Sequence, residues 1–267
     1  MSNDSLRRTF DAVPEVYDRV RPEHPAAAFD ALFAYVRDRR DGNEIEAVEI
    51  GPGTGQATKT LLAHGARVTA AEIGPRLARF LNEKFAGEPR LRVYDEAFED
   101  LDLSPASYDL VFAANSFHWV EHAVRYTKPH ALLRAGGVLA TLSMIQVRSG
   151  ADRGYFDRTQ AIYARYGEPA WKPGEMTPEA DEATPPEYRE LLASPLFGDV
   201  TLLRYPWDQT YDTAAYTDLM RSYSNMQAMA PDVRESLIAE LSEVIDREYD
   251  GRVTRPLVDV LVMARKR

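Results

Sequence analysis

The stretch that decides the fold is residues 47–56, AVEIGPGTGQ, a short apolar run that ends in three alternating glycines. A segment with helical apolar spacing, QATKTLLAHG, follows at once, and Gly65 is placed to end that helix. The pattern therefore predicts a strand, a glycine turn and a helix. Such a unit brings a ligand close to bare backbone at a helix N-terminus, where N–H groups are unpaired and the helix dipole is positive.

The spacing of the glycines separates three kinds of nucleotide-binding loop. A phosphate-cradling loop ends in Gly-Lys-Ser/Thr, whereas Thr58 precedes the Lys-Thr pair at 59–60. A dinucleotide fingerprint reads G-x-G-x-x-G, whereas Gln56 occupies the place of the third glycine. Residues 49–55 instead put an acidic residue before G-x-G-x-G. The loop thus departs from the first two patterns.

A second acidic residue follows at a spacing that suits a nucleoside. Glu72 ends the next apolar strand, RVTAAEI, about twenty residues on. A carboxylate at that place accepts hydrogen bonds from both ribose hydroxyls of an adenosine. The alternative is a tight turn that happens to be rich in glycine. Because the strand, the helix and the downstream acid are all in register, the sequence predicts nucleoside binding.

The rest of the chain predicts the α/β class. Strand and helix patterns alternate from residue 47 to residue 145, as in a parallel sheet. Residues 108–114, YDLVFAA, form the near-continuous apolar run expected of a strand buried on both faces. Residues 253–266 alternate apolar and polar side chains, which predicts an antiparallel strand half-covered by helices. Residues 122–133 predict a helix that Pro129 either kinks or divides into two pieces, and residues 149–196 a proline-rich, partly ordered cap.

Composition restricts the function classes. The chain has 267 residues and a net charge of −10, which argues against nonspecific nucleic-acid binding. There is no cysteine, so disulfides, thiolate catalysis and cysteine-ligated metals are excluded, and no His/Asp/Glu spacing indicates a metal site. The N-terminus has no apolar signal region and no stretch of about 18 apolar residues occurs. We therefore expect a cytoplasmic protein that does not bind membranes.

Two blocks resemble one enzyme family. Residues 47–56 resemble the first motif of class I S-adenosylmethionine-dependent methyltransferases. Residues 97–120, AFEDLDLSPASYDLVFAANSFHWV, are similar to the segment that trans-aconitate methyltransferase-like and type 11 subfamilies carry after the third strand and through the fourth. The resemblance implies a Rossmann-like, seven-stranded, mostly parallel sheet with an antiparallel terminal strand, helices on both faces and a mainly helical cap. It also implies one domain over 1–267, with a core at about 40–148 and 197–267 and cap elements at about 1–39, 149–196 and 213–249.

The cofactor implied by the resemblance is S-adenosylmethionine. In the family an N-terminal helix covers the cofactor, a polar or acidic residue and the backbone after it meet the adenine edge, and residues after the fourth strand lie at the site. Carried onto this sequence, the expected cofactor-binding residues are Tyr17, Arg21, Glu49, Gly51, Gly53, Gly55, Gln56, Glu72, Ile73, Glu96, Ala97, Phe98 and Asn115.

The acceptor side is less defined by the sequence. His118 and Trp119 follow a strand end, where open α/β sheets bind ligands, and Tyr223 occupies a site-roofing position in the resembled subfamilies. These three are the expected substrate-binding residues. His118 is the first candidate for a general base, because its ordinary pKa is near neutrality; Tyr17 and Tyr223 follow.

A carboxylate acceptor needs no base, and the arginines considered for clamping it are Arg21, Arg148 and Arg221. We expect a small-molecule acceptor methylated at oxygen, with neither metal nor nucleic acid involved. Two alternatives stay open, namely S-adenosylmethionine binding with other or no methyl-transfer chemistry and a nicotinamide-dependent oxidoreductase. The sequence leaves the oligomeric state unknown.

Overall fold

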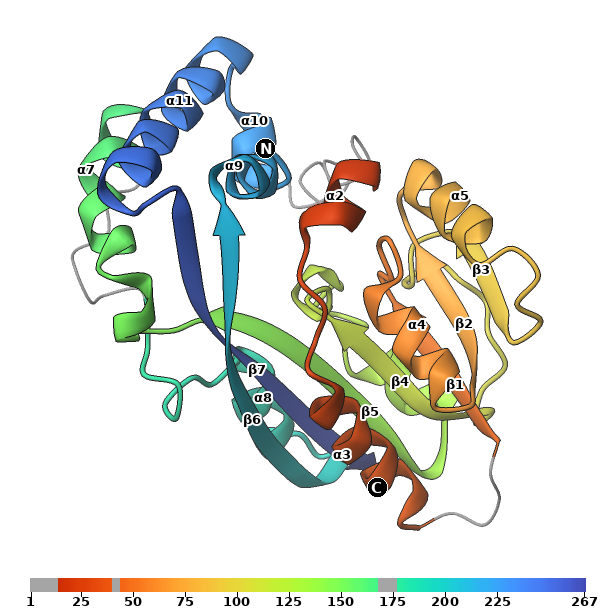
Figure 1. The fold of residues 1–267 in the computed structure, drawn as a ribbon. Coiled ribbons are helices and arrows are strands. Elements are labelled where there is room, and N and C mark those ends of the chain that lie inside the picture. Colours follow the sequence, from red (N-terminus) through yellow and green to blue (C-terminus); the bar gives the residue numbers. More distant parts are fainter. Residues whose placement is uncertain (1–13, 40–43, 168–176) are drawn as a thin grey trace.

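The computed structural model describes residues 14–39, 44–167 and 177–267, and their centre is one seven-stranded sheet (Figure 1). The strand order is β3-β2-β1-β4-β5-β7-β6. Strands β1 to β5 pair in parallel, and β7 is antiparallel to both of its neighbours, β5 and β6. The predicted fold class is confirmed. The strands are β1 (Ile45–Ile50), β2 (Ala66–Glu72), β3 (Leu91–Asp95), β4 (Tyr108–Ala114), β5 (Leu133–Gln146), β6 (Phe197–Asp212) and β7 (Arg252–Lys266).

Helices cover both faces of the sheet. One face is packed by α3 (Ala26–Arg37), α4 (Gln56–Ala63) and α5 (Pro75–Lys84), and the other by α6 (Thr127–Leu132) and α8 (Pro186–Ala193). Strands β1 and β4 contribute buried side chains to both apolar clusters, which is why their sequences read as continuous apolar runs. These layers leave the carboxyl ends of β1, β2 and β4 facing α2 (Pro14–Val20) (Figure 1).

A third apolar cluster forms the cap. It is built from α7 (Tyr155–Arg165), α9 (Thr213–Arg221), α10 (Ser224–Ala228) and α11 (Pro231–Glu248), which stand together beyond the long ends of β6 and β7 (Figure 1). The ring of Tyr155 meets those of Tyr216 and Tyr249 edge-on, at centroid separations of 5.5 and 5.3 Å. Aromatic pairs in this geometry contribute more than their buried area alone, so the cap has a packed core of its own.

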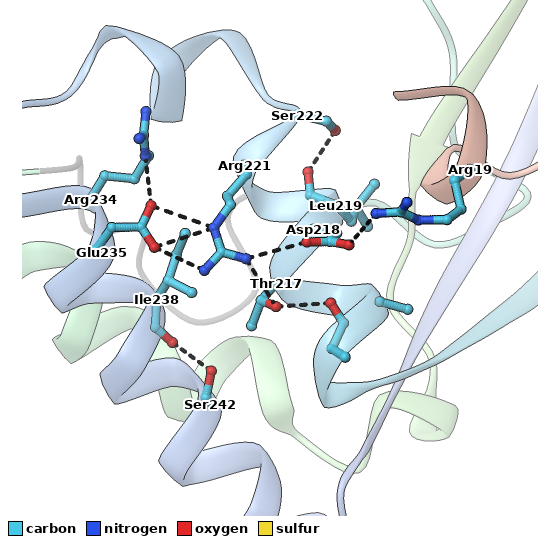
Figure 2. A network of polar contacts seen from close by, with 12 residues as sticks. Arg19, Thr217, Asp218, Leu219, Arg221, Ser222, Arg234, Glu235, Ile238 and Ser242 are labelled. Atoms are coloured by element: carbon cyan, nitrogen blue, oxygen red, sulfur yellow. Dashed lines mark hydrogen bonds and ion pairs between the residues drawn. The ribbon is translucent and has the colours of Figure 1, made fainter. Parts of the chain in front are cut away.

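Ion pairs on the outside of the cap join it to α2. Arg221 on α9 donates to Glu235 on α11 at 2.8 Å and to Asp218 at 3.3 Å (Figure 2). Asp218 in turn accepts a hydrogen bond of 2.7 Å from Arg19 on α2 (Figure 2). The network therefore ties α9, α11 and α2 together, although its members are partly exposed and each pair adds little stability.

Strand β7 corrects one prediction from the sequence. It was expected to be half-covered, but residues 256–265 are buried without a break. The reason is its place inside the sheet, since β6 covers its outer edge while α3 and α8 lie over its two faces. A buried charge, Asp259, lies in the middle of this strand with none of its surface exposed.

Three helical segments also differ from expectation. Of residues 122–133 only α6 is helical, and Pro129 fits without a kink because it lies in the first turn, where no N–H is required. The proline-rich segment contains α8, which begins at Pro186 and packs on the sheet. Likewise α3, expected in the cap, packs on the sheet. The proposed division of residues 1–267 into core and cap stays a prediction.

No helix in the described ranges is both long and apolar enough to span a membrane.

Candidate active site

A cleft with an empty volume of about 1110 Å³ opens at the carboxyl ends of β1, β2, β4 and β5. Parallel sheets place ligand sites at this edge because the connecting loops diverge there. The residues predicted from the sequence that line the cleft are Arg21, Glu49, Gly51, Gly53, Gln56, Glu72, Ile73, Phe98, Asn115 and Trp119. Two short stretches of sequence, the glycine loop and the end of β4, thus meet in one cavity.

The glycine loop forms the floor of the cleft. Gly51 has φ of +61°, and a Cβ added there would lie 2.8 Å from Cβ of Ser116. Only glycine accepts both the left-handed backbone and this close approach without strain. The N–H of Gly53 donates to Oε2 of Glu72 at 3.0 Å, so the loop is held against the end of β2. The backbone here is bare enough for a ligand to approach closely.

Glu72 anchors two loops at once. It is 4% exposed, and its Oε1 accepts a hydrogen bond of 2.9 Å from the N–H of Gly74, while Oε2 takes that of Gly53. These two backbone bonds fix the carboxylate of Glu72 in the lining of the cleft. This is the arrangement that the two hydroxyls of a ribose require.

Glu49 is a second buried carboxyl group in the wall. Its Oε2 accepts a 2.7 Å hydrogen bond from the hydroxyl of Thr58 on α4. Burial raises the pKa of Glu49 to about 7, the Thr58 bond lowers it, and the neighbouring charge of Glu72 raises it further. The group therefore titrates near neutral pH, and a cation in the cleft would favour its ionised form.

Several predicted residues lie elsewhere. A Cβ on Gly55 would meet Leu81 and Phe85, each at 2.6 Å, so this glycine allows α4 and α5 to pack closely rather than lining the cleft. Glu96 is exposed. The predicted residues absent from the lining are Gly55, Glu96, Ala97, His118 and Tyr223, and the side chain of Tyr17 is outside the described part of the structure.

Of the predicted residues after β4, Asn115 and Trp119 line the cleft, whereas His118 lies at its rim. Asn115 has φ of +54°, and its Oδ1 accepts a 2.7 Å hydrogen bond from the N–H of Met144. Its amide N–H groups stay available at the cleft. The ring of His118 lies 4.7 Å from that of Trp119, but His118 is exposed and only Trp119 reaches the lining. Although the residue as a whole is exposed, desolvation of its imidazole by the surrounding chain, and then the nearby charge of Arg125, lower the pKa of His118.

Sequence reasoning missed His24. It lines the cleft, and its Nδ1 lies 2.7 Å from Oδ2 of Asp259, with side-chain exposures of 6% and 0%. Oδ1 of Asp259 has no hydrogen-bond partner in the structure. The available signal was the charged residue in the apolar run VDVLV at 258–262, because a buried carboxylate requires a partner. Nothing in the sequence identified that partner as His24.

The N-terminal helix α2 is linked to the glycine loop through Lys84. Asp18 on α2 accepts a 2.6 Å hydrogen bond from Lys84, whose ammonium also donates to the carbonyl of Thr54 in the loop at 2.9 Å. Arg21, just after α2, lines the cleft. Of the other two arginines considered for a carboxylate clamp, Arg148 pairs with Glu179, and Arg221 belongs to the network in Figure 2.

The residues present fit an adenosine-containing cofactor with a positive charge. Gly51 places no side chain in the loop, the carboxylate of Glu72 lies in the cleft lining, and Phe98 provides a buried apolar ring there. Glu49 supplies a carboxylate that a cation would stabilise. These features agree with S-adenosylmethionine, whereas the loop lacks the third glycine of a dinucleotide fingerprint.

Comparisons with known proteins agree with this geometry. A family model described as a methyltransferase domain matches residues 48–141. An uncharacterized methyltransferase-like protein of Schizosaccharomyces pombe is 23% identical over 244 residues, which cover 89% of this chain and 86% of that protein. A putative type II methyltransferase from Anaeromyxobacter dehalogenans superimposes with a TM-score of 0.61 at 20% identity, covering 92% of this chain and 97% of that one.

A further neighbour was solved with the cofactor bound. Phosphoethanolamine N-methyltransferase 2 of Haemonchus contortus, in complex with S-adenosylmethionine, superimposes with a TM-score of 0.55 at 14% identity. The match covers 100% of this chain and 60% of that enzyme. At these identities the solved structures show the fold, while the matched domain and the relatives show the activity. The chain is a class I S-adenosylmethionine-dependent methyltransferase.

Proposed function

We propose that this enzyme methylates an oxygen of a small-molecule acceptor. The observation that carries the proposal is the buried pair of His24 and Asp259 in the wall of the cofactor cleft. A hydroxyl acceptor must lose its proton during transfer, and an imidazole oriented by a carboxylate is suited to receive it. The concave, partly apolar lining of the cleft supports a small acceptor beside the cofactor.

The cofactor half of the site follows from the cleft lining. Glu72 holds the ribose hydroxyls, the backbone at Gly51 and Gly53 approaches the cofactor closely, and Phe98 packs on the adenine. Asn115 binds the amino-acid part through its amide. The remaining expected contacts, from Tyr17, Arg21, Glu49, Gly55, Gln56, Ile73, Glu96 and Ala97, stay proposals, and those of Gly55, Glu96 and Ala97 would require a shift of the backbone toward the cleft.

The bound cofactor supplies an already activated methyl group on a sulfonium. What remains for the chain is to align the acceptor oxygen and to exclude water, which together can lower the barrier by roughly 7–11 kcal/mol at best. α2 and Arg21 cover the cleft from the cap side, and Trp119 adds an apolar wall. These elements keep the reacting groups apart from bulk water.

Proton removal is assigned first to His24. Its Nδ1 is engaged by Asp259, which leaves Nε2 as the other ring nitrogen to accept a proton. His118 stays a candidate at the rim, where closure of the cleft would have to carry it inward. Tyr223 is a weaker candidate because its hydroxyl oxygen already accepts a 2.6 Å hydrogen bond from Arg255. The expected absence of a nucleic-acid or membrane partner and the cytoplasmic location also stay predictions.

Calorimetric titration tests the cofactor half directly. Wild type, Glu72→Ala and a control, Glu83→Ala, are titrated with S-adenosylmethionine and, in parallel, with NADH. Glu83 lies on α5, and its side chain is 64% exposed. We expect saturable binding of S-adenosylmethionine alone, weakened about tenfold or more in Glu72→Ala and unchanged in the control. Tighter binding of NADH would contradict the cofactor roles proposed here.

A screen of acceptor compounds tests which atom receives the methyl group. Release of S-adenosylhomocysteine is followed with compounds that bear hydroxyl, carboxyl or amine groups, and products are identified by mass spectrometry. Transfer to oxygen, with His24→Asn slowing hydroxyl methylation by 10²- to 10⁴-fold, is the expected result. Transfer to nitrogen alone would rule out the oxygen assignment. Binding without any transfer would favour the alternative of an S-adenosylmethionine-binding protein of other chemistry.

A further inference from the structure

Arg255 on β7 has an unusual set of partners. Its Nη1 donates to the hydroxyl oxygen of Tyr223 at 2.6 Å, and its Nη2 and Nε donate to Oε1 of Gln146 at 3.0 and 3.3 Å. Both partners are neutral. Among the residues that the structure describes, no carboxylate lies within 4.0 Å of this guanidinium. Three of its five N–H groups are thus used and two remain.

Two more deeply buried arginines each have a carboxylate neighbour, whereas the half-buried Arg255 and Arg204 donate only to neutral groups among the described residues. The side chain of Arg125 is 8% exposed and lies 3.7 Å from Glu190, and that of Arg265 is 5% exposed and lies 3.6 Å from Asp38. A guanidinium stays charged at all relevant pH values. Withdrawing that charge from water without an opposite charge is costly. Among the described residues, Arg255 therefore lacks the carboxylate neighbour that Arg125 and Arg265 have.

Tyr223 links the guanidinium of Arg255 to the lining of the cleft. Arg21 lines the cleft, and its guanidinium carbon sits 4.7 Å from the centroid of the Tyr223 ring, the same residue whose hydroxyl meets Arg255. Met144 also lines the cleft, and Gln146 is the next residue of β5 on that face of the sheet. Tyr223 therefore connects the two arginines, one at the cleft and one beyond it.

A further donor lies on the same face. Trp207 on β6 is paired with Leu257, and alternation along β7 puts Leu257 and Arg255 on one side of the sheet. The indole N–H of Trp207 is buried and has no hydrogen-bond partner. This end of the sheet therefore brings together the donors of Arg255 and Trp207, and no carboxylate of the described residues pairs with Arg255, so the arrangement is complementary to a carboxylate.

We propose that Arg255, together with Arg21, Gln146 and Tyr223, binds a carboxylate of the methyl acceptor. The inference rests on the proposed function, because it places the acceptor between this anion site and the cofactor loop. A carboxylate matches the planar N–H edge of a guanidinium and provides the missing negative charge. The site holds the acceptor in place, and the methylated oxygen belongs to another group of the same molecule.

The first experiment measures anion binding without knowledge of the natural acceptor. Protein loaded with S-adenosylhomocysteine is titrated with succinate, inorganic phosphate and the neutral analogue succinamide, by calorimetry and by thermal unfolding. Succinate is expected to bind and to raise the unfolding midpoint, since a ligand that binds only the folded state stabilises it. Succinamide is expected to do neither. Phosphate binding as strongly as succinate would overturn the assignment to a carboxylate.

Substitutions on β7 test whether succinate binds at Arg255. Arg255→Gln should weaken succinate binding at least tenfold, while Arg252→Gln, an exposed residue at the start of the same strand, should leave it unchanged. Arg255→Met should unfold no more readily than wild type, because it removes a charge that has no carboxylate partner among the described residues. Equal succinate binding by wild type and Arg255→Gln would overturn the inference.

Two outcomes distinguish this inference from the proposed function. If wild type fails to bind S-adenosylmethionine, the proposed function fails first. If the cofactor binds normally and succinate does not, only the anion site is wrong. A third result, in which Arg255→Gln weakens S-adenosylhomocysteine binding tenfold and leaves the succinate response unchanged, would assign the guanidinium to the carboxylate of the cofactor and overturn the inference as well.

Discussion

Nδ1 of His24 lies 2.7 Å from Oδ2 of Asp259, and both side chains are almost wholly removed from solvent. The two residues are 235 positions apart in the chain. The pair joins the segment after α2 to the innermost part of β7, so it fixes the position of one wall of the cleft. It has structural consequences that do not depend on its proposed part in proton removal.

The first prediction concerns the energy of this pair. A double-mutant cycle with His24→Ala and Asp259→Ala should give a coupling free energy of about 2 kcal/mol or more, because removal of either partner leaves a buried polar group unpaired. Urea denaturation of the four proteins measures it. The matched control is the cycle on His64 and Asp30, which lie 3.1 Å apart with side chains 21% and 73% exposed. That pair should couple by less than about 1 kcal/mol, and equal coupling in both cycles would contradict the prediction.

The second prediction concerns pH and Glu49. Burial raises its pKa from 4.5 to about 7 in the folded protein, so the folded state holds a proton that the unfolded state releases between these values. The free energy of unfolding should therefore fall as pH rises across this window, by about 3 kcal/mol. Above pH 7 this contribution is constant.

Substitution of Glu49 by glutamine checks that sign. Glu49→Gln does not titrate, so it should be more stable than wild type at pH 8, and the difference should shrink toward pH 5. Denaturant titrations at several pH values measure the effect, with the exposed Glu83→Gln as the control for the substitution. A stability difference that grows as the pH is lowered would show that the sign is wrong. Binding of S-adenosylmethionine should also weaken below pH 7, since a cation favours the ionised carboxylate.

The third prediction compares two glycines with positive φ. Gly51→Ala combines left-handed backbone strain with a contact of 2.8 Å to Ser116, whereas Gly65→Ala, at φ of +88°, has nothing within 4 Å of the new Cβ. Gly65→Ala should cost about 1 kcal/mol of stability and leave cofactor binding intact. Gly51→Ala should cost more and should weaken S-adenosylmethionine binding at least tenfold. Calorimetry and thermal unfolding separate the two effects, and equal affinities would be incompatible with the proposed role of the loop.

The fourth prediction concerns the attachment of α2. Asp18 pairs with Lys84 near the loop, and the next residue, Arg19, pairs with Asp218 on the cap. Asp18→Asn and Arg19→Gln should each lower stability by less than about 1 kcal/mol, since these pairs are partly exposed. Hydrogen exchange of the α2 backbone should nevertheless accelerate, and more so in the double variant. Arg79→Gln breaks an exposed pair within α5 and serves as the control. Unchanged exchange in the double variant would mean that apolar contacts alone hold α2.

The sequence allowed much of the sheet to be predicted because the signals there are local. Apolar runs, the glycine loop and the acid that ends β2 lie within a few residues of each element that they define. β7 was harder to predict, since its burial depends on the neighbouring strand and on α3 and α8. The placement of α3 on the sheet likewise depends on which apolar surface is available to it, and its own helical pattern does not specify that surface.

The candidate site shows the same difference. Gly51, Gly53 and Glu72 were predicted to act together, and the structure brings them into one cleft. By contrast, Gly55 proved to face α5, and His118 stays at the rim. A residue's place in a motif indicates that it lies near the loop, but the direction of its side chain follows from packing on neighbouring helices.

The sequence by itself therefore determined the strand–loop–helix unit, the parallel pairing of the first strands and the nucleoside character of the cofactor, because contiguous residues carry these signals. Only the tertiary structure decided that His24 meets Asp259 and that, within the described part of the chain, Arg255 has neutral partners alone. Both relationships arise because β7 inserts between β5 and β6 and the cap packs beyond it. The partners of a buried charged side chain come from segments that are distant in the sequence. A local pattern of residues does not predict which segments these are.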